Sequence, residues 1–388
     1  MSKHVRLDNV YADYASATPI DAEVRFVMCA TQEYANPSAL HSSGRRMREE
    51  IEQVRARILK ILSADDYELY FTGSGTESDN LALCGVAHAY KNKGRHILVS
   101  AVEHKAVIES AESLRDEGFE VEYIPVDDTG RVDPEKVGDM LRTDTILVSV
   151  MHVNNELGTI EPIADIARIV KEKSTALLHT DACQSIGLFT LPEADLITFN
   201  GSKIYGPRGI GVLAVRNGVH ITPILYGGGQ EHGVRPGTES LMAINGLATA
   251  VEKAESLRTS ESVRLSTLRE HFIVGLQERI PDIHVNGGGV PHIVHVTVPY
   301  IEGESILLAL DAVGIAVSTG SACSSKDLRP SHVLKAIGQS DDLMHGSIRF
   351  SFGRQTTRED IEYILQEFPS IVERLRAVSV LTTHAYAT

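Results

Sequence analysis

The sequence contains no tryptophan, and its four cysteines, Cys29, Cys84, Cys183 and Cys323, lie far apart without a CxxC pair. Disulfide frameworks and zinc knuckles use cysteines at short, repeated spacings, so we expect neither and predict a reducing compartment, the cytoplasm. No apolar run approaches the roughly 20 residues that span a bilayer, and the first eight residues lack the apolar core of a signal peptide. We therefore expect no membrane partner and no metal site.

The chain also lacks an excess of basic residues. Its 388 residues include 37 Lys and Arg against 52 Asp and Glu, which gives a formal net charge of −15. A protein of this sign repels phosphates and anionic lipids, so direct binding of nucleic acid is not expected. Apolar residues make up 43% and charged residues 23%, the usual composition of a globular protein long enough for two domains.

The most informative stretch is an apolar run that ends in Asn-Gly-Ser and presents Lys203. The run predicts a buried strand, and the Gly-Pro-Arg-Gly sequence that follows predicts a loop entering another strand at Ile210–Val215. An ammonium at the end of a buried strand is partly desolvated, which lowers its pKa and frees the amine for Schiff-base chemistry. The alternative is a solvated loop lysine.

Strand and helix patterns alternate along the first half of the chain. Strands are predicted at 67–72, 96–100, 121–124, 145–150, 176–180 and 196–199. Repeated βα units with short loops predict a mostly parallel sheet covered by helices. Ligands collect at the carboxyl ends of the strands in such sheets. The polar residues predicted at these ends are Thr72–Thr76, His104, Asn154, Asn155, Asp181, Gln184 and Lys203.

Two of these stretches resemble parts of a cofactor site. Gly73–Asn80 links a strand to a helix, where backbone N–H groups at the positive helix end can cradle a phosphate, although a plain capped helix is the commoner cause of this pattern taken alone. Asp181 ends a strand, where it either caps the next helix or pairs with a protonated ring nitrogen. A Schiff-base lysine, a phosphate cradle, an aspartate and a stackable histidine together predict a pyridoxal phosphate site.

Three motifs extend this interpretation to a family. The chain reads M-H-V-N-N-E-L-G at Met151–Gly158, H-T-D-A-C-Q-S at His179–Ser185 and S-T-G-S-A-C-S-S at Ser318–Ser325. In this order they resemble the cysteine desulfurases of the NifS/IscS type, within the class V, fold-type I pyridoxal phosphate enzymes. The resemblance runs over about residues 10–353. It implies an α/β fold with a mostly parallel, seven-stranded sheet and a smaller α+β domain.

The second half of the chain predicts that smaller domain. A long helix over 238–256 is expected to leave the large domain, and a separate helix is expected at 263–279. Strands at 292–298 and 347–351 and helices at 304–313 and 358–378 follow. We place the large cofactor-binding domain at 15–256 and the small domain, which carries the cysteine loop, at 1–14 and 257–388.

The resemblance assigns roles around the cofactor ring. It implies that Lys203 forms the Schiff base with pyridoxal phosphate and that Asp181 keeps the ring nitrogen protonated. It implies that His104 stacks on the ring and moves protons. Gln184 is expected to contact the ring hydroxyl, with Asn155 near it.

The resemblance also assigns the phosphate contacts. Gly75, Thr76, Asn200 and Ser202 are implied to hold the phosphate, and Thr238 is implied to reach it from the partner subunit of a homodimer. The family usually has Ser-Gly-His-Lys where this chain has Asn-Gly-Ser-Lys at 200–203. The replaced histidine removes one phosphate contact, so we expect weaker retention of the cofactor.

Three further residues complete the predicted site. The resemblance implies that Asn36 and Arg349 hold the substrate carboxylate, Arg349 as a bidentate fork. Cys323 lies in a loop of small residues, where an exposed and reactive thiol is expected, and it is the predicted nucleophile. Cys29 and Cys84 fall on helical patterns and are expected in the core, and Cys183 is interpreted as structural.

The predicted activity is conversion of L-cysteine to L-alanine, with transfer of the sulfur to Cys323 as a persulfide. A scaffold or carrier protein for iron–sulfur clusters or thiolated tRNA is the expected acceptor. Two alternatives on the same fold are a selenocysteine lyase and an aminotransferase, although Cys323 argues against the latter. A third is a non-catalytic sulfur-relay scaffold that holds the cofactor poorly because of Ser202.

Overall fold

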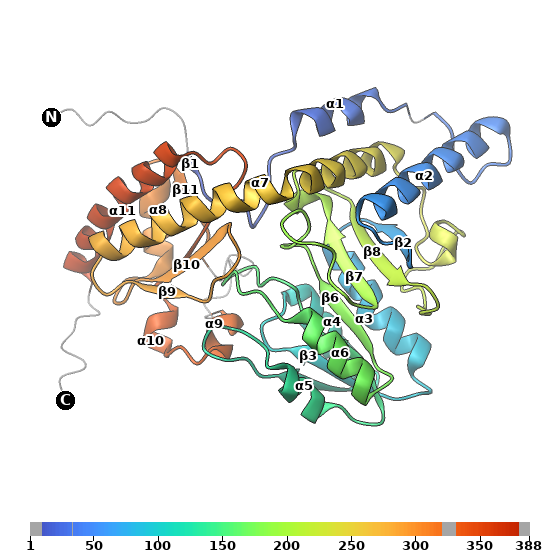
Figure 1. Ribbon diagram of the computed structural model, residues 1–388, viewed down its shortest axis with the longest axis horizontal. Helices are drawn as coiled ribbons and strands as arrows, with labels where there is room; N and C mark the ends of the chain where they lie inside the picture. Colours follow the sequence, from blue (N-terminus) through green and yellow to red (C-terminus); the bar gives the residue numbers. More distant parts are fainter. Residues whose placement is uncertain (1–9, 33, 320–330, 380–388) are drawn as a thin grey trace.

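The computed structural model describes residues 10–32, 34–319 and 331–379. Its elements form two parts that share one long helix, α7 (Leu241–Arg279) (Figure 1). The larger part contains the predicted seven-stranded sheet, in the order β2-β8-β7-β6-β5-β3-β4. The strands are β2 (Tyr67–Thr72), β3 (His96–Ser100), β4 (Glu120–Ile124), β5 (Thr145–Ser149), β6 (Leu177–Asp181), β7 (Leu196–Asn200) and β8 (Gly211–Arg216).

The mostly parallel character of this sheet is confirmed. Only β8 runs opposite to its neighbours β2 and β7, and all other neighbouring strands pair in parallel. All five residues of β3 and of β5 are buried. Such continuous burial is expected for strands that helices cover on both faces, and it explains why these strands read as apolar runs in the sequence.

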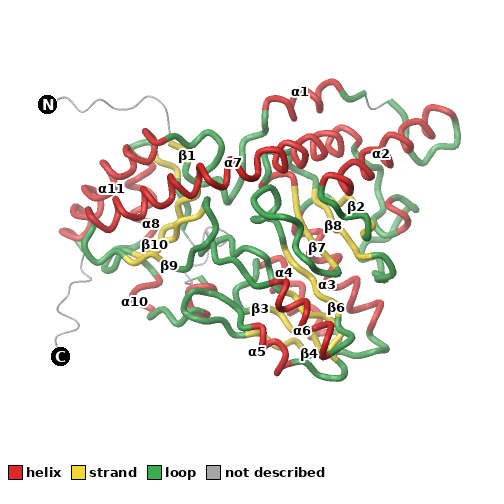
Figure 2. The backbone as a smooth tube through the Cα atoms, viewed as in Figure 1, coloured by secondary structure: helices red, strands yellow, loops and turns green. Residues whose placement is uncertain are grey.

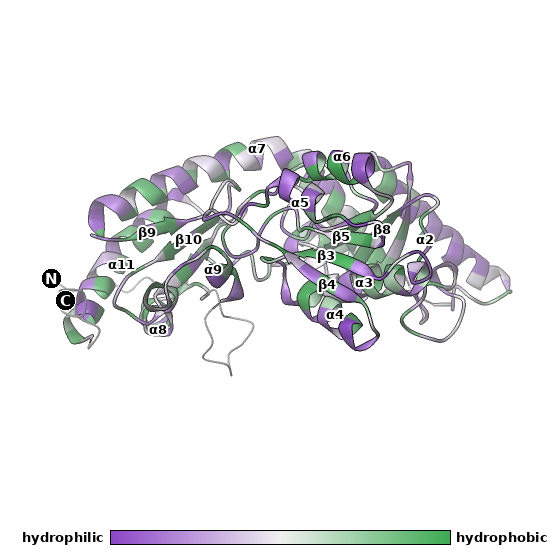
Figure 3. Cartoon of the chain, turned by 90° about the horizontal axis from the view of Figure 1, so that it is seen from below, coloured by the Kyte–Doolittle hydropathy of each residue, from purple (hydrophilic) through white to green (hydrophobic). Residues whose placement is uncertain are grey.

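Helices cover both faces of the large sheet. Figure 3 shows α6 and α7 over one face and α3 and α4 over the other, with apolar strands between them. The helices of this part are α1 (Ala22–Ala30), α2 (Ser42–Ile61), α3 (Gly75–Tyr90), α4 (Lys105–Asp116), α5 (Pro134–Met140) and α6 (Ile163–Lys173), with the short 3-10 turns η1 (Gly201–Lys203) and η2 (Glu231–Gly233).

The smaller part combines two small sheets with helices (Figure 2). One sheet is antiparallel, in the order β12-β10-β9, and the other is the parallel pair β1-β11. The pairing of β1 with β11 brings the start of the described chain into this part. Its elements are β1 (Val10–Tyr11), β9 (His284–Asn286), β10 (Ile293–Thr297), α8 (Gly303–Asp311), β11 (Ile315–Ala316), α9 (His332–Ala336), α10 (Asp341–Met344), β12 (Ser347–Ser351) and α11 (Arg358–Val378).

Helix α7 is continuous, whereas two separate helices were expected from the sequence. Residues 257–262 break the apolar periodicity, but ion pairs of Arg258 with Glu255 and of Arg264 with Glu261, each three residues apart, stabilise the helix there. Its 39 residues span about 58 Å. The first half of α7 packs into the core of the large part and the second half into that of the smaller part. The predicted domain boundary after residue 256 falls inside this helix.

The carboxyl ends of β2, β3, β5, β6 and β7 lie at one edge of the large sheet, because these strands run in the same direction. The loops after these strands carry the polar residues predicted for a ligand site. The architecture therefore brings segments from most of the chain to one place. Within the described residues, no helix combines the length and apolarity needed to cross a membrane.

Candidate active site

A cavity of about 600 Å³ lies at this edge of the sheet, walled by residues of both parts of the chain. We refer to it as the main cavity. Most of the predicted site residues line it. They are Gly75, Thr76, His104, Asn155, Asp181, Gln184, Asn200, Ser202, Lys203 and Arg349.

Lys203 ends the short turn η1, directly after β7. Its Nζ donates hydrogen bonds to the carbonyl of Ala15 at 2.8 Å and to the carbonyl of Ser16 at 2.5 Å. Burial lowers the pKa of Lys203. The lysine is thus a desolvated amine inside the cavity, not a solvated loop residue.

Two aspartates stand at the floor of the main cavity. Asp181 ends β6, and its Oδ1 accepts a hydrogen bond from the backbone N–H of Cys183 at 2.8 Å. Asp79, on α3, is fully buried, and burial together with the charge of Asp181 raises the pKa of Asp79 well above its usual range. This direction favours the neutral form of Asp79, which adds no second negative charge beside Asp181.

His104 is the N-cap residue of α4 and lies in the wall of the cavity. Its Nδ1 accepts a hydrogen bond from the backbone N–H of Ala106 at 3.1 Å. Because Nδ1 accepts, the proton of the neutral ring is on Nε2. Burial lowers the pKa of His104, which favours this neutral form. The ring thus offers an Nε2–H donor.

The start of α3 forms a narrow cradle with the end of β7. Ser74 is the N-cap, and Gly75 is the first residue of the helix. A Cβ at Gly75 would lie 2.8 Å from Nδ2 of Asn200 and 3.0 Å from Sγ of Cys183, so a larger residue does not fit. The hydroxyl of Ser202 donates to Oδ1 of Asn200 at 2.9 Å. Backbone N–H groups at such a helix start bind anions.

This donor set fits pyridoxal phosphate. The cradle at Gly75 and Ser202 suits a phosphate, Asp181 suits a protonated ring nitrogen, and the amine of Lys203 suits an aldehyde. All four residues line the same cavity. The main support for this fit is the absence of a side chain at Gly75, where Asn200 and Cys183 leave no room for one. The backbone of Gly75 can therefore come close to a ligand.

Arg349 projects from β12 into the main cavity and is 6% exposed. Its Nη1 donates to the carbonyl of Asn155 at 2.7 Å, and its Nη2 donates to Oδ1 of Asp13 at 2.9 Å and to Oγ of Ser16 at 2.7 Å. Arg349, which was predicted to bind the substrate carboxylate, therefore faces the cavity, and several of its N–H groups are engaged by the protein.

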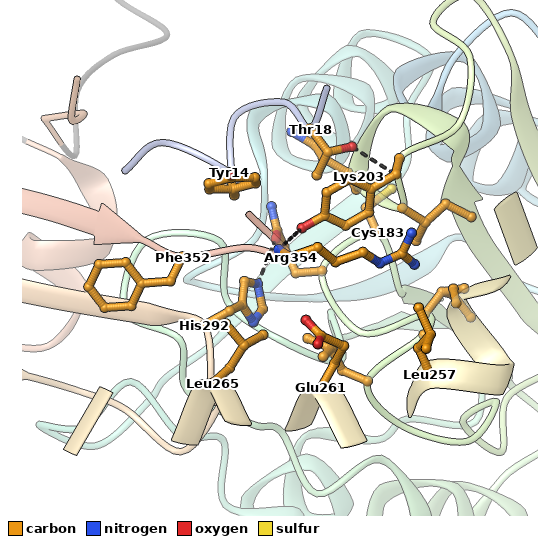
Figure 4. A pocket seen from close by; sticks show the side chains of 17 residues that line it. Tyr14, Thr18, Cys183, Lys203, Leu257, Glu261, Leu265, His292, Phe352 and Arg354 are labelled. Atoms are coloured by element: carbon orange, nitrogen blue, oxygen red, sulfur yellow. Dashed lines mark hydrogen bonds between the residues drawn. The ribbon is translucent and has the colours of Figure 1, made fainter. Parts of the chain in front are cut away.

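Gln184 and Lys203 line both the main cavity and a smaller cavity of about 60 Å³. Figure 4 shows the smaller cavity from close by. The amide Nε2 of Gln184 donates to the carbonyl of Ala15 at 2.8 Å. Its Oε1 lies 3.3 Å from Nε2 of His292, which faces the smaller cavity. The carbonyl of Ala15 can only accept, so the atom of Gln184 that faces it is the amide nitrogen. The amide oxygen therefore faces His292, and His292 is the donor to Gln184. One N–H of the amide is left for a ligand.

Two predicted residues lie elsewhere. Asn36 and Thr238 line a separate cavity of about 340 Å³, together with Tyr34 and Leu241. The described part of a single chain does not bring Asn36 to Arg349. Asn36, expected at the substrate carboxylate, and Thr238, expected at the phosphate of a partner subunit, therefore line the same cavity.

Cys323 lies outside the described residues, so its predicted role is not tested by these contacts. The residues on either side of segment 320–330 are described. Thr319 before it and Ser331 after it both line the main cavity. The chain therefore enters and leaves this segment at the cavity wall.

Several cavity residues were not predicted from the sequence. Glu156 is buried, which raises its pKa to about 7, and its Oε2 accepts a hydrogen bond from Oγ of Ser331 at 2.6 Å. Glu103 is also buried, and its backbone carbonyl accepts from Nε2 of His332 at 2.9 Å. Glu156 lies within the motif at 151–158, so the motif could have identified it as a site residue from the sequence. Glu103 and Asp79 had no such signal, because acidic residues near a helix start are usually exposed.

The expectation for the helical cysteines was wrong for one of them. Cys29 is exposed on α1, because α1 buries only Val24. Cys84 is half-buried on α3. Cys183 lines the main cavity, where Nδ2 of Asn200 contacts its Sγ at 3.1 Å.

Comparisons with known proteins identify the family of this chain. The aminotransferase class-V family matches residues 10–364. A cysteine desulfurase IscS of Dictyoglomus turgidum is 45% identical over 379 residues, which cover 95% of this chain and 96% of that protein. A solved NifS-like protein is 34% identical, with a TM-score of 0.88 over 95% of this chain and 100% of that one. A structure titled SspA in complex with cysteine is 32% identical, with a TM-score of 0.78 over 88% and 98%.

Proposed function

The chain belongs to the class V aminotransferase family and is a cysteine desulfurase, and we propose that it removes the sulfur of L-cysteine in the main cavity. The observation that carries the proposal is the half-buried Lys203, whose desolvation lowers its pKa, at the carboxyl edge of the sheet in one cavity with Asp181, His104 and Arg349. The similar SspA structure, which contains cysteine, supports the choice of substrate.

Pyridoxal phosphate is the proposed cofactor. When bound, it supplies an electron sink for the negative charge that develops on the substrate carbons. Lys203 would hold it covalently, and Asp181 would keep its ring nitrogen protonated. Gly75, Thr76, Asn200 and Ser202 would hold its phosphate, and Gln184 with its remaining N–H and Asn155 would lie near its ring hydroxyl.

Two residues are proposed to move protons. The lowered pKa of Lys203 favours the neutral amine, which can take the proton from the substrate α-carbon. His104 presents its proton on Nε2, because Nδ1 is engaged by the backbone of Ala106. The neutral ring therefore offers a hydrogen bond from Nε2, and His104 delivers a proton as an acid from its imidazolium form, which the lowered pKa makes more acidic. Arg349 is proposed to bind the substrate carboxylate and to fix the amino acid between these groups.

Cys323 is the proposed acceptor of the sulfur. Its thiolate attacks the substrate sulfur, so a sulfur–sulfur bond forms as the carbon–sulfur bond breaks, and the carbon takes up a proton. L-Cysteine and the Cys323 thiol thus give L-alanine and a Cys323 persulfide, without an external oxidant. The position of Thr319 at the cavity wall supports this role, because the four residues to Cys323 span at most about 14 Å.

The active unit is proposed to be a homodimer in the cytoplasm. Asn36 and Thr238 lie together away from the main cavity, which supports the proposal that both residues act in the site of the partner subunit. The persulfide would pass to a scaffold or carrier protein for iron–sulfur clusters or thiolated tRNA.

The test is the mass of the intact protein after one exposure to L-cysteine without a reductant. With bound cofactor, we expect one added sulfur atom on a peptide that contains Cys323. Lys203→Ala should show no added sulfur, because the amine is missing. Sulfur on Cys323 in Lys203→Ala, or no sulfur in the wild type with bound cofactor, would contradict the proposal.

A further inference from the structure

Ser16 contacts two of the basic side chains that line the main cavity, those of Arg349 and Lys203. Its hydroxyl accepts a hydrogen bond from Nη2 of Arg349 at 2.7 Å, and its backbone carbonyl accepts from Nζ of Lys203 at 2.5 Å. Ser16 is exposed, lies in a turn shortly after β1 and lines the cavity. One residue therefore connects the proposed carboxylate-binding group to the proposed catalytic amine.

The hydrogen-bond donors of Arg349 limit how a carboxylate can bind. Nη2 has two N–H groups, and these donate to Asp13 and Ser16. Nη1 donates to the carbonyl of Asn155, and Nε is buried without a partner among the described residues. Both edges of a guanidinium that can bind a carboxylate with two hydrogen bonds include Nη2. Bidentate binding therefore requires that Asp13 or Ser16 leave Nη2.

Ser16 is the partner that a carboxylate can replace. Asp13 carries a charge, is only 20% exposed in its side chain and does not line the main cavity, whereas Ser16 is neutral, exposed and faces it. A charge-assisted hydrogen bond is roughly twice as strong as a neutral one. A substrate carboxylate therefore gains by replacing the Ser16 hydroxyl, which can keep its own hydrogen bond to Oδ1 of Asp13 at 2.8 Å, and not by replacing Asp13, which keeps Arg349 in position.

We propose that Ser16 couples Arg349 to Lys203: a substrate carboxylate displaces the Ser16 hydroxyl from Arg349, and Ser16 then withdraws its carbonyl from the Lys203 amine. Ser16 is a positioning residue, since it acts on the reaction through these two side chains. The proposal rests on the function proposed above for Arg349.

The expected consequence is a more reactive amine. A carbonyl that accepts a hydrogen bond from Nζ stabilises the ammonium form. Loss of the Ser16 carbonyl leaves that of Ala15 as the remaining acceptor, and this change favours the neutral amine, which is the nucleophile and base. Lys203 is thereby activated when a ligand with a carboxylate is bound, which favours amino acids over simple amines.

The test measures how fast the full-length protein, depleted of cofactor, takes up pyridoxal phosphate. Yellow absorbance of the lysine-bound form reports the reaction, in sodium propionate or in sodium chloride at equal concentration. Propionate carries a carboxylate but no amine, so it does not react with the aldehyde. We expect propionate to accelerate uptake about twofold to tenfold over chloride, the range for loss of one hydrogen bond.

Two variants at one position isolate the coupling. Ser16→Ala keeps the backbone carbonyl and removes the hydroxyl, so propionate should no longer accelerate uptake. The same variant should be inhibited more strongly by propionate in turnover of L-cysteine, because Nη2 of Arg349 has one free N–H. Ser16→Thr keeps a hydroxyl and should behave like the wild type. Equal acceleration in Ser16→Ala would overturn the proposal.

The wild type separates this proposal from the proposed function. If propionate competes with L-cysteine but does not accelerate cofactor uptake, the coupling through Ser16 is wrong and the role of Arg349 stands. If propionate neither competes nor accelerates, the role proposed for Arg349 is wrong as well, and the coupling fails with it.

Discussion

Asp79 lies buried beside Asp181 at the floor of the main cavity, and the charge of Asp181 helps to keep Asp79 protonated. The two carboxyl groups therefore differ in role although they have the same chemistry. Asp181 supplies a negative charge, and Asp79 fills the space behind it as a neutral group. This division is typical of paired acids in active sites.

The neutral state of Asp79 predicts the effect of two matched substitutions. Asp79→Asn keeps the shape and the neutral charge, so we expect turnover and cofactor affinity within about twofold of the wild type. Asp181→Asn removes the charge proposed to act on the ring nitrogen, and turnover should fall at least about 100-fold. Steady-state kinetics and titration with pyridoxal phosphate check both. An equal loss in the two variants would show that Asp79 is ionised.

Glu156 makes stability depend on pH. Its pKa is raised to about 7 by burial, so between about pH 4.5 and 7 the folded chain holds a proton that the unfolded chain releases. The stability of the wild type therefore falls as pH rises through this window. Glu156→Gln does not titrate, and its stability relative to the wild type should rise by up to about 3 kcal/mol between pH 5 and 8. Urea unfolding at both pH values measures this, and an unchanged difference would contradict it.

The ion pair of Arg55 and Glu231 anchors the segment that leads to Thr238. Nη1 and Nη2 of Arg55 donate to Glu231 at 2.8 and 2.9 Å, and the backbone N–H of Phe71 donates to the same carboxylate at 2.8 Å. Glu231→Ala removes the buried carboxylate and leaves Arg55 with Glu52, whose side chain is 47% exposed. We therefore expect a loss of about 3 kcal/mol in the free energy of unfolding.

The control for this substitution is the exposed ion pair of Arg57 and Glu252. Glu252→Ala should change the free energy of unfolding by less than about 1 kcal/mol, because water screens exposed charges. Chemical denaturation of both variants provides the comparison. Similar losses of unfolding free energy in Glu231→Ala and Glu252→Ala would mean that the buried ion pair stabilises the fold no more than the exposed one.

Ser202 predicts a gain of function. The hydroxyl of Ser202 donates to Oδ1 of Asn200 beside the proposed phosphate cradle, at the position where the family resemblance implies a histidine. Ser202→His should slow the loss of pyridoxal phosphate during dialysis about threefold or more, since it adds a donor to the phosphate. Ser202→Ala serves as the control and should not retain the cofactor better. Faster loss from Ser202→His would contradict the assignment of this side of the cavity to the phosphate.

The sequence predicted those parts of the fold that depend on local pattern. Apolar runs located the strands of the large sheet, and polar residues at their ends located the loops that carry Asp181, His104 and Lys203. These signals work because a parallel sheet buries whole strands and collects their carboxyl ends at one edge. The family motifs added the roles of these residues, but not their contacts.

What the sequence did not predict depends on distant contacts. The hydrogen bond between Ser16 and Arg349 joins residues 333 positions apart, and no local pattern marks either partner. Asp79 lies near the start of α3, where acidic residues are usually exposed, but it is buried in the folded chain. The sequence predicted two helices in place of α7, because the middle of α7 is polar. In the structure that stretch lies between two cores and is stabilised as helix by ion pairs.

The most direct test of the account is a product balance. The purified protein is incubated with pyridoxal phosphate, L-cysteine and a thiol reductant, and sulfide and alanine are measured together, beside Cys323→Ser. We predict equal amounts of sulfide and alanine from the wild type and neither product from the variant. Equal product formation by Cys323→Ser, or a yellow wild-type protein that forms neither product, would contradict desulfuration through Cys323.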